Sequence, residues 1–333
     1  MRNGLDISKL LRPMSSERLQ DAALPPCEAC GAVDHSSVAT KRGWALRRCS
    51  RCGLIFVWPQ PEPQQLDAVY RKSSGYFAGA GSDLSKSSPR GAIRLHNKLA
   101  SLGMSRGSFL DVGCGTGQMV YHMQRLGWQS MGIDINADTV SIARENGLDV
   151  TAASLETAQL SADSFDVVHM GDVLEHVRSP RQTFLACRRL LSRNGAMVIR
   201  TPNWQCGFGK ATLAASRLLR LPWAYSEAPY HLYDFCPTAI LRLARATGFE
   251  VTSLECSGRV RLLYAVGGTG CFDDLKLLLK GCGKQSRLRE VLLNAPKLSV
   301  VGAWLLPLWI WGTSLDWLAG SGKALTIVAR RRH

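Results

Sequence analysis

The stretch 108-SFLDVGCGTG-117 decides the fold of this chain, because an apolar strand pattern runs directly into a run of alternating glycines. Gly113, Gly115 and Gly117 lack side chains, so the backbone can turn sharply there and approach a ligand closely. A helix pattern follows at 117–126, and a helix N-terminus offers unpaired N–H groups to a carboxylate or phosphate. The stretch predicts a strand, a ligand-binding loop and a helix in succession.

Strand and helix patterns continue to alternate on the carboxyl side of this loop. The strand patterns lie at 130–135, 148–153, 165–170, 196–201, 249–256 and 324–330, and the helix patterns near 91–103, 136–146 and 180–192. Alternating units of this length predict an α/β fold with a parallel, doubly wound, Rossmann-like sheet of seven strands. Asn194-Gly195 is a C-cap signal, and it predicts the end of the helix before the fifth strand.

Asp134 ends the second strand pattern, 17 residues beyond Gly117. A carboxylate at that position can accept hydrogen bonds from both hydroxyls of a ribose. The loop and Asp134 together predict an adenosyl cofactor, S-adenosylmethionine, whose methionine carboxylate suits the helix N-terminus. Dinucleotide-binding loops space their glycines as GxGxxG, so a dinucleotide fold is the weaker alternative.

The loop resembles the first motif of class I S-adenosylmethionine-dependent methyltransferases, with Asp111 as its acidic residue. SFDVVHMGDVLEHV at 164–177 and LLSRNGAMVIRTPN at 190–203 are similar to later motifs of ubiquinone-biosynthesis-type small-molecule methyltransferases. The resemblance implies that 170–172 line the methionine end of the cofactor and that 154–155 border the adenine. The expected cofactor residues are Asp111, Gly113, Cys114, Gly115, Gly117, Asp134, Ile135, Ser154, Leu155, Met170, Gly171 and Asp172.

Two CxxC pairs near the N-terminus have the spacing of a metal site. Cys27 and Cys30 form the first pair, and Cys49 and Cys52 form the second after 18 intervening residues. Four thiolates predict a tetrahedral zinc site, and the zinc is expected to be structural because no position is left open for water. The alternatives are four free cysteines, a redox pair, or a nucleic-acid reader that uses the surrounding arginines.

Composition divides the chain into four parts. We expect a mobile basic leader at 1–24, a zinc ribbon at 25–58, a linker and cofactor lid at 59–90, and a methyltransferase domain at 91–333. Within that domain, 256–323 reads as a helical apolar insertion before the last strand.

The ribbon resembles the leader of a bacterial methyltransferase group associated with cell-envelope sugar or lipid biosynthesis. In that comparison Tyr70, Tyr76 and Phe77 either close over the cofactor or pack as ordinary side chains.

Methyl transfer to a hydroxyl requires an aligned acceptor and a group that removes its proton, for which histidine is the natural candidate. Asp172, Glu175 and His176 are spaced to share one helix face. They could form part of the cofactor pocket, supply a general base, or hold a divalent metal as the similar ubiquinone-pathway enzymes are thought to do. His231, in PYHLYDFCP at 229–237, could bind substrate, act as a base or anchor its loop. The candidate catalytic residues are therefore His176, His231 and Glu175.

Composition limits the classes of partner and the location. The chain has 333 residues, is 46% hydrophobic and carries a formal net charge of +15, which excludes a disordered or fibrous protein and favours an anionic partner. Residues 1–20 lack a secretory signal pattern, so a cytoplasmic location is expected. The uncharged, tryptophan-rich stretch 298–315 could cross a membrane, lie on the inner face of an anionic one, cover an acceptor pocket, or pack in the core.

The sequence predicts an S-adenosylmethionine-dependent methyltransferase that acts on a small molecule. The expected reaction is O-methylation of a sugar, a lipid-linked glycan or another amphiphile. One alternative is an RNA methyltransferase, which the basic charge and the ribbon would fit, although HMGDVLEHV at 169–177 lacks an NPPY-type loop. The other is a non-enzymatic adenosyl-cofactor-binding protein, because binding does not prove turnover. The expected partners are a small-molecule acceptor and an anionic membrane surface, with nucleic acid disfavoured.

Overall fold

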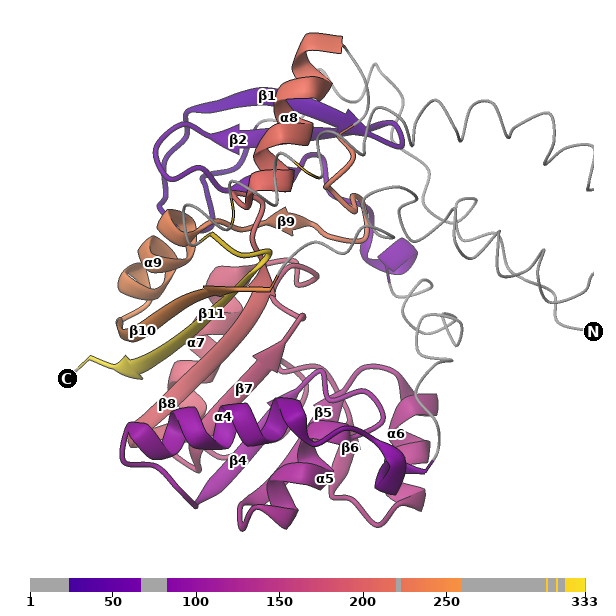
Figure 1. Cartoon of the computed structure of the whole chain (residues 1–333), viewed down its shortest axis with the longest axis vertical. Helices are drawn as coiled ribbons and strands as arrows, with labels where there is room; N and C mark the ends of the chain where they lie inside the picture. The colour runs from indigo at the N-terminus through magenta and orange to yellow at the C-terminus, as the bar shows by residue number, and fades with distance from the viewer. Residues whose placement is uncertain are drawn as a thin grey trace, which may run out of the picture.

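The computed structural model describes residues 24–66, 83–219, 223–258 and 321–332, together with residues 310 and 316. These residues form a seven-stranded sheet with helices on both faces and a smaller four-stranded sheet beside one end of it (Figure 1). Residues 1–23 of the expected leader, the three aromatics at 70, 76 and 77, and most of the insertion at 256–323 lie outside the described residues.

The large sheet confirms the predicted doubly wound α/β architecture, with strand order β10-β11-β8-β7-β4-β5-β6. Its strands are β4 (Ser108–Val112), β5 (Gln129–Asp134), β6 (Val150–Ala152), β7 (Phe165–Gly171), β8 (Leu191–Pro202), β10 (Phe249–Ser257) and β11 (Ala324–Arg331). The strands from β8 to β6 pair in parallel, whereas β11 is antiparallel to both β8 and β10. The predicted seventh strand, β11, inserts between β8 and β10 in the opposite direction.

Two helical layers cover the faces of this sheet. The helices are α4 (Arg90–Ser101), α5 (Gln118–Arg125), α6 (Ala137–Glu145), α7 (Pro180–Leu190) and α9 (Pro237–Ala246), and a short 3-10 helix, η2, spans Leu84–Lys86. Leu99 of α4 and Met123 of α5 pack with Phe109 on one face. Phe184 of α7 and Leu243 of α9 belong to the core on the other face. Alternating strand side chains enter these two layers, as a two-faced sheet requires.

Helix α7 ends earlier than Asn194-Gly195 predicts. Its C-cap is Leu191, which is already extended (φ −69°, ψ 135°) and buried, and β8 begins at that residue. Leu191 pairs with Phe165, and a Cβ on Gly195 would lie 3.0 Å from the Phe165 carbonyl oxygen. Gly195 thus permits a close approach to β7 within a strand, and it does not terminate the helix.

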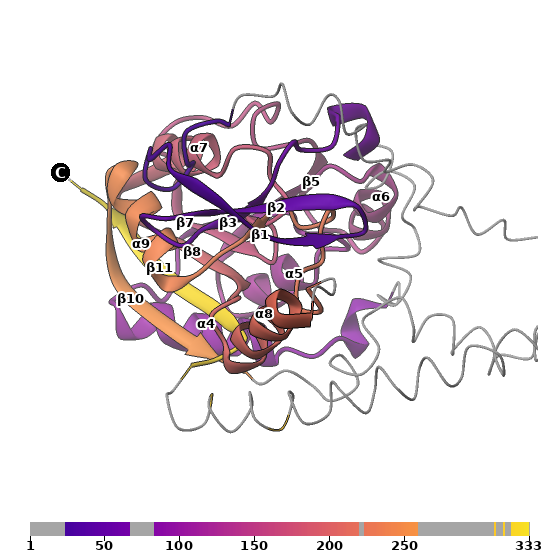
Figure 2. The ribbon, with the colours of Figure 1, turned by 90° about the horizontal axis from the view of Figure 1, so that it is seen from above.

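The small sheet joins the predicted ribbon to the main domain. Its order is β1 (His35–Lys41), β2 (Trp44–Cys49), β3 (Ile55–Val57) and β9 (Tyr233–Asp234), all antiparallel. Arg42 and Gly43 both have positive φ, which suits the two-residue hairpin turn between β1 and β2. Helix α8 (Gly207–Leu219) packs against β1, and Figure 2 shows the ribbon strands lying across the end of the large sheet. The ribbon and the main domain share one hydrophobic core.

Within the described ranges, no helix has the length and the apolar character that a membrane span requires.

Phe109 tests the core between β4 and the α4–α5 layer. Its fully buried ring meets those of Trp128 and His169, each with a centroid distance of 5.9 Å. Phe109→Ala should lower the free energy of unfolding by about 3–5 kcal/mol, because it removes apolar contacts and leaves a cavity. Ile93→Ala, on the exposed side of α4, should stay within about 0.5 kcal/mol. Urea denaturation followed by circular dichroism measures both, and equal losses would contradict this packing.

Candidate functional site

A cavity of about 990 Å³ opens at the carboxyl ends of the parallel strands β4, β5 and β7. Loops after these strands, the turn at 172–178 and the loop at 225–231 surround it. Ligands in open α/β sheets bind at this edge, so the position agrees with the expectation from the glycine loop. The expected site residues that line the cavity are Gly113, Asp134, Ile135, Ser154, Leu155, Gly171, Asp172, Glu175, His176 and His231.

Asp134 is the centre of one half of the cavity. Its Oδ2 accepts a hydrogen bond from the Gly115 N–H at 2.8 Å, and its Oδ1 accepts one from the Asn136 N–H at 2.8 Å. Burial raises the pKa of Asp134, and these two N–H donors oppose that rise. Each oxygen retains a second lone pair, so the carboxylate can still accept hydroxyl groups from a ligand. The exposed side chain of Ile135 adds an apolar surface beside it.

The glycine loop needs glycine for two separate reasons. Gly113 lines the cavity with φ +70°, and a Cβ there would lie 2.4 Å from a methyl group of Val173. Gly117 has φ +83°, and its Cβ would lie 2.4 Å from Leu148. Both the backbone conformation and the close neighbours exclude larger side chains at these positions.

Five expected cofactor residues lie behind the cavity wall instead of on it: Asp111, Cys114, Gly115, Gly117 and Met170. Asp111 is buried on β4, where its Oδ1 lies 2.7 Å from Nδ1 of the buried His169. Cys114 is buried against Gly132, and Met170 is fully buried in the core. These residues support the loop from below, in contrast to Gly113 and Asp134, which face the cavity.

Three ionisable side chains converge on the other half of the cavity. Ligand atoms of Glu175, His176 and His231 all lie within 4.8 Å of one another. The two imidazole rings meet edge to face with a centroid distance of 4.8 Å. Nδ1 of His176 lies 3.0 Å from the Tyr230 carbonyl oxygen, and Nε2 of His231 lies 3.8 Å from Oε2 of Glu227. The structure therefore brings together two histidines that the sequence predicts only as separate candidates.

Burial sets the protonation of this cluster. It lowers the pKa of His176, and together with the neighbouring His176 it lowers the pKa of His231 well below the ordinary value. Burial also raises the pKa of Glu175 to about 8, with the nearby Asp172 carboxylate adding to the rise. The Glu175 carboxyl accepts a hydrogen bond from the Thr201 hydroxyl at 2.9 Å. At neutral pH both histidines are thus neutral, and Glu175 is mostly protonated.

The prediction that Asp172, Glu175 and His176 share a helix face is wrong. The turn at 172–178 is not helical, because Asp172 has φ +57° and its N–H donates to the Arg200 carbonyl at 2.8 Å. The Asp172 carboxylate pairs with the Arg200 guanidinium. Asp172 is consequently turned toward β8, and His231 takes the third place beside Glu175 and His176.

Sequence reasoning missed several residues that line the cavity, among them Arg200, Tyr225 and Glu227. Arg200 had a usable signal, since it is a charged residue at the carboxyl end of a predicted parallel strand. Tyr225 and Glu227 lie in a loop with no motif of their own, and only the fold places them beside His231.

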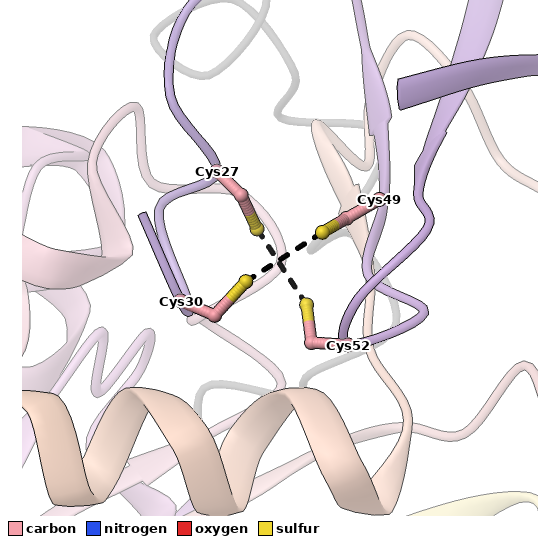
Figure 3. Close-up of side chains that lie close together, drawn as sticks. All are labelled: Cys27, Cys30, Cys49 and Cys52. Atoms are coloured by element: carbon pink, nitrogen blue, oxygen red, sulfur yellow. Dashed lines mark hydrogen bonds between the residues drawn. The ribbon is translucent and has the colours of Figure 1, made fainter. Parts of the chain in front are cut away.

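The four predicted zinc ligands lie around one point (Figure 3). The Sγ atoms of Cys27 and Cys52 are 3.6 Å apart, as are those of Cys30 and Cys49. A tetrahedral zinc with Zn–S bonds of about 2.3 Å separates its sulfur ligands by about 3.8 Å. A hydrogen bond from the Cys52 thiol holds the pKa of Cys27 well below its ordinary value, which favours the thiolate that binds metal. The four residues therefore fit a closed, four-thiolate zinc site.

Comparisons with known proteins agree with this geometry. A family model described as a methyltransferase domain matches residues 85–254, about half of the chain. A ubiquinone biosynthesis O-methyltransferase of Xanthomonas oryzae pv. oryzae is 34% identical over 157 residues, which cover 45% of this chain and 64% of that protein. The namesake of Roseobacter denitrificans is 29% identical over 241 residues, which cover 68% of this chain and 90% of that protein. The chain thus spans less than two thirds of the length of the Xanthomonas relative.

Among solved structures, the (4+2)-cyclase SpnF superposes with a TM-score of 0.51 at 20% identity, covering 82% of this chain and 98% of that one. This likeness concerns the fold.

Glu175 gives the site a pH-dependent stability. Its pKa of about 8 in the folded protein exceeds the ordinary value of 4.5. The contribution of Glu175 to the free energy of unfolding is therefore fully present below pH 4.5 and is lost as pH rises through 8. Glu175→Gln keeps the shape and has no proton to lose. Its free energy of unfolding should therefore rise relative to wild type as pH increases, by roughly 1.4 kcal/mol for each pKa unit of the shift.

Urea denaturation at pH 5 and at pH 9 measures this difference. Glu250→Gln, on the exposed edge strand β10, removes a carboxylate outside the cavity and is the matched control. Parallel pH curves for Glu175→Gln and wild type would contradict the buried, protonated carboxyl.

Proposed function

The chain belongs to the methyltransferase-domain family and has the class I fold of S-adenosylmethionine-dependent methyltransferases, and from this we propose that it methylates a small-molecule acceptor. The observation that carries the proposal is one cavity with two unlike halves. Gly113 and Asp134 form a cradle for an adenosyl group, and the Glu175, His176 and His231 cluster faces the same space. Two relatives named O-methyltransferases support an oxygen acceptor. The fold alone does not fix the reaction, since a cyclase shares it.

The cofactor half would hold S-adenosylmethionine, which supplies an electrophilic methyl group. Asp134 would accept the ribose hydroxyls, and Ser154 and Leu155, with Ile135 beside them, would border the adenine. Gly113, Gly171 and Asp172 would border the methionine end. The loop that carries these groups would be fixed by buried residues that do not line the cavity, namely Asp111, Cys114, Gly115, Gly117 and Met170.

His176 is the proposed general base. A carbonyl oxygen can only accept a hydrogen bond, so the contact with Tyr230 places the proton of the neutral ring on Nδ1 and the lone pair on Nε2. With its pKa lowered by burial, the ring stays neutral at pH 7 and can take the proton of an acceptor hydroxyl at Nε2.

His231 is proposed to orient the acceptor oxygen, with the Glu227 carboxylate beside it. Glu175 is proposed as a positioning residue. Its carboxyl is held by Thr201, and its backbone carbonyl accepts the N–H groups of Leu232 and Tyr233, so it joins the turn that carries His176 to the loop that carries His231. The same cluster could hold a divalent metal, because its ligand atoms lie within 4.8 Å of one another.

The walls of the acceptor half favour an amphiphilic acceptor, such as a sugar, a lipid-linked glycan or a related molecule. Val173 and Val177 offer apolar surface, whereas Arg200, Glu227 and Lys323 offer charged groups in the same cavity. We further propose that Cys27, Cys30, Cys49 and Cys52 hold a structural zinc ion. Contact of the 298–315 stretch with an anionic membrane stays a prediction, since that stretch lies almost wholly outside the described residues.

The acceptor can be identified by incubating the protein with methyl-labelled S-adenosylmethionine and fractionated cell lysate. Label in the lipid or soluble small-molecule fraction is the expected result. Label in RNA would favour an RNA methyltransferase instead. Cofactor binding without label in any fraction would favour a binding protein that does not catalyse transfer.

Asp134→Asn should weaken binding of S-adenosylmethionine roughly ten- to hundredfold, because hydrogen bonds to a charged group contribute about 1.5–3 kcal/mol. Asp138→Asn, an exposed residue in the first turn of α6, is the matched control and should bind as wild type does. Isothermal titration calorimetry measures both, and equal affinity of Asp134→Asn and wild type would remove Asp134 from the site.

The two histidines should separate kinetically once a labelled acceptor fraction is in hand. His176→Ala should lower kcat by roughly 10²–10⁴-fold, the usual contribution of a general base. His231→Ala should raise the acceptor KM more than it lowers kcat. Steady-state assays of methyl transfer measure both, and unchanged turnover in His176→Ala would exclude it as the base. A metal at this cluster would be indicated instead if a chelator abolishes the activity of the wild type while mass spectrometry shows that zinc on the four cysteines remains bound.

A further inference from the structure

The loop that carries His231 is built onto the ribbon sheet. Tyr233 and Asp234 form β9, which pairs with Phe56 and Ile55 of β3. Immediately before that strand, the Val57 N–H donates to the Leu232 carbonyl at 2.9 Å. The residue that follows His231 is therefore fixed by a backbone hydrogen bond to the ribbon.

The β1–β2 hairpin holds the start and the middle of the same loop. Nζ of Lys41 donates to the Trp223 carbonyl at 3.0 Å, and the Trp223 N–H donates to the Thr40 carbonyl at 3.3 Å. Arg42 donates to the Ala228 carbonyl at 3.4 Å, and its guanidinium lies over the Tyr230 ring. Contacts from the ribbon thus extend over residues 223–234.

The backbone at the second CxxC pair contacts the main domain directly. The thiol of Cys236 donates to the Cys52 carbonyl at 3.3 Å, and the indole N–H of Trp204 donates to the Gly53 carbonyl at 3.1 Å. The backbone N–H of Trp204 donates to the Phe235 carbonyl at 3.1 Å. The backbone of one metal knuckle is consequently hydrogen-bonded to the segment where the His231 loop ends.

The cofactor half is connected in a different way. The Gly113 N–H donates to the Ile133 carbonyl, the Ala153 N–H donates to the Asp134 carbonyl, and the Gly115 N–H donates to the Asp134 carboxylate. These hydrogen bonds run between the loops after β4, β5 and β6, on the large sheet.

We infer that the four-cysteine module is a positioning element for the acceptor half of the cavity alone. A metal ion on Cys27, Cys30, Cys49 and Cys52 fixes the knuckle and β3, these fix residues 223–236, and those residues place His231 beside His176. Metal occupancy then controls acceptor binding while the cofactor half keeps its structure. This inference rests on the proposed function in assigning the His231 side of the cavity to the acceptor.

The experiment compares the zinc-loaded full-length protein with the same protein after zinc is removed by a chelator, with metal content measured by mass spectrometry. Hydrogen–deuterium exchange of residues 223–236 and 108–136 is followed separately, and S-adenosylmethionine affinity is measured by calorimetry. Zinc removal should accelerate exchange in 223–236 by about tenfold or more. Exchange in 108–136 and the cofactor affinity should stay within about twofold.

Trp204→Phe tests the same link with all four thiolates intact, in case the zinc-free protein unfolds. It keeps the buried aromatic ring and removes the N–H bond to Gly53, so exchange in 223–236 should rise and the acceptor KM should increase more than the cofactor KM. Trp128→Phe is the matched control. Trp128 is equally buried, and this substitution removes a 3.2 Å hydrogen bond from its indole N–H to His96 in the layer on the opposite face of the sheet.

Faster exchange in both segments with loss of cofactor affinity would overturn the inference, because the module would then stabilise the whole domain. Unchanged exchange in 223–236 for the zinc-free protein and for Trp204→Phe would also overturn it. The proposed function fails in a different way, through absence of cofactor binding in the zinc-loaded wild type, and the exchange pattern is read independently of that result.

Discussion

The alignment of the ends of three parallel strands is the constraint on which the site depends. Val112 of β4 pairs with Ile133 of β5 and with Met170 of β7, so the loops that follow these strands begin at the same height. The glycine loop, the Asp134 corner and the turn at 172–178 therefore open onto one cavity. A slip of one residue in any of these strands would exchange its two faces and would also move its loop out of the common edge.

The parts of this arrangement that could be predicted from the sequence are those specified locally. An apolar strand before alternating glycines indicates a loop whatever the rest of the chain does, and Gly113 and Gly117 carry that signal in the backbone conformation they need. The two CxxC pairs are likewise local, since each knuckle closes over a few residues. The cofactor loop, the sheet and the thiolate cluster follow from such signals.

The parts that could not be predicted depend on contacts between distant segments. Asp172 adopts a left-handed conformation because β8 supplies partners for its N–H and its carboxylate, and this overrides a helical spacing of acidic and histidine residues. His176 meets Tyr230 across 54 positions of sequence. Strand β9 has two residues, too few for a periodic pattern, and it exists because β3 offers an edge to pair with.

Polar groups of β9, beside the loop that carries His231, are held by hydrogen bonds within the protein, which limits their reorganisation when a ligand enters the cavity. The buried Asp234 carboxylate accepts from the Ser226 hydroxyl at 3.0 Å, and burial raises its pKa to about 7. The Tyr233 hydroxyl donates to the Arg178 carbonyl at 2.9 Å. A site whose groups are already oriented keeps more of its binding energy for the reaction, since little is lost in ordering side chains.

The antiparallel pairing of β10 with β11 has a consequence for how the chain tolerates change in length. Ser257 pairs with Ala324, and the Lys323 N–H donates to the Gly258 carbonyl, so the backbone leaves the sheet and returns to it at one point. That point adjoins the cavity, which Lys323 and Ala324 line. The two ends of the segment 259–320 are therefore held next to each other, so the entropic cost of closing it depends only weakly on its length. A change of side chain at Lys323 would therefore alter the cavity wall at the same point where this segment is closed.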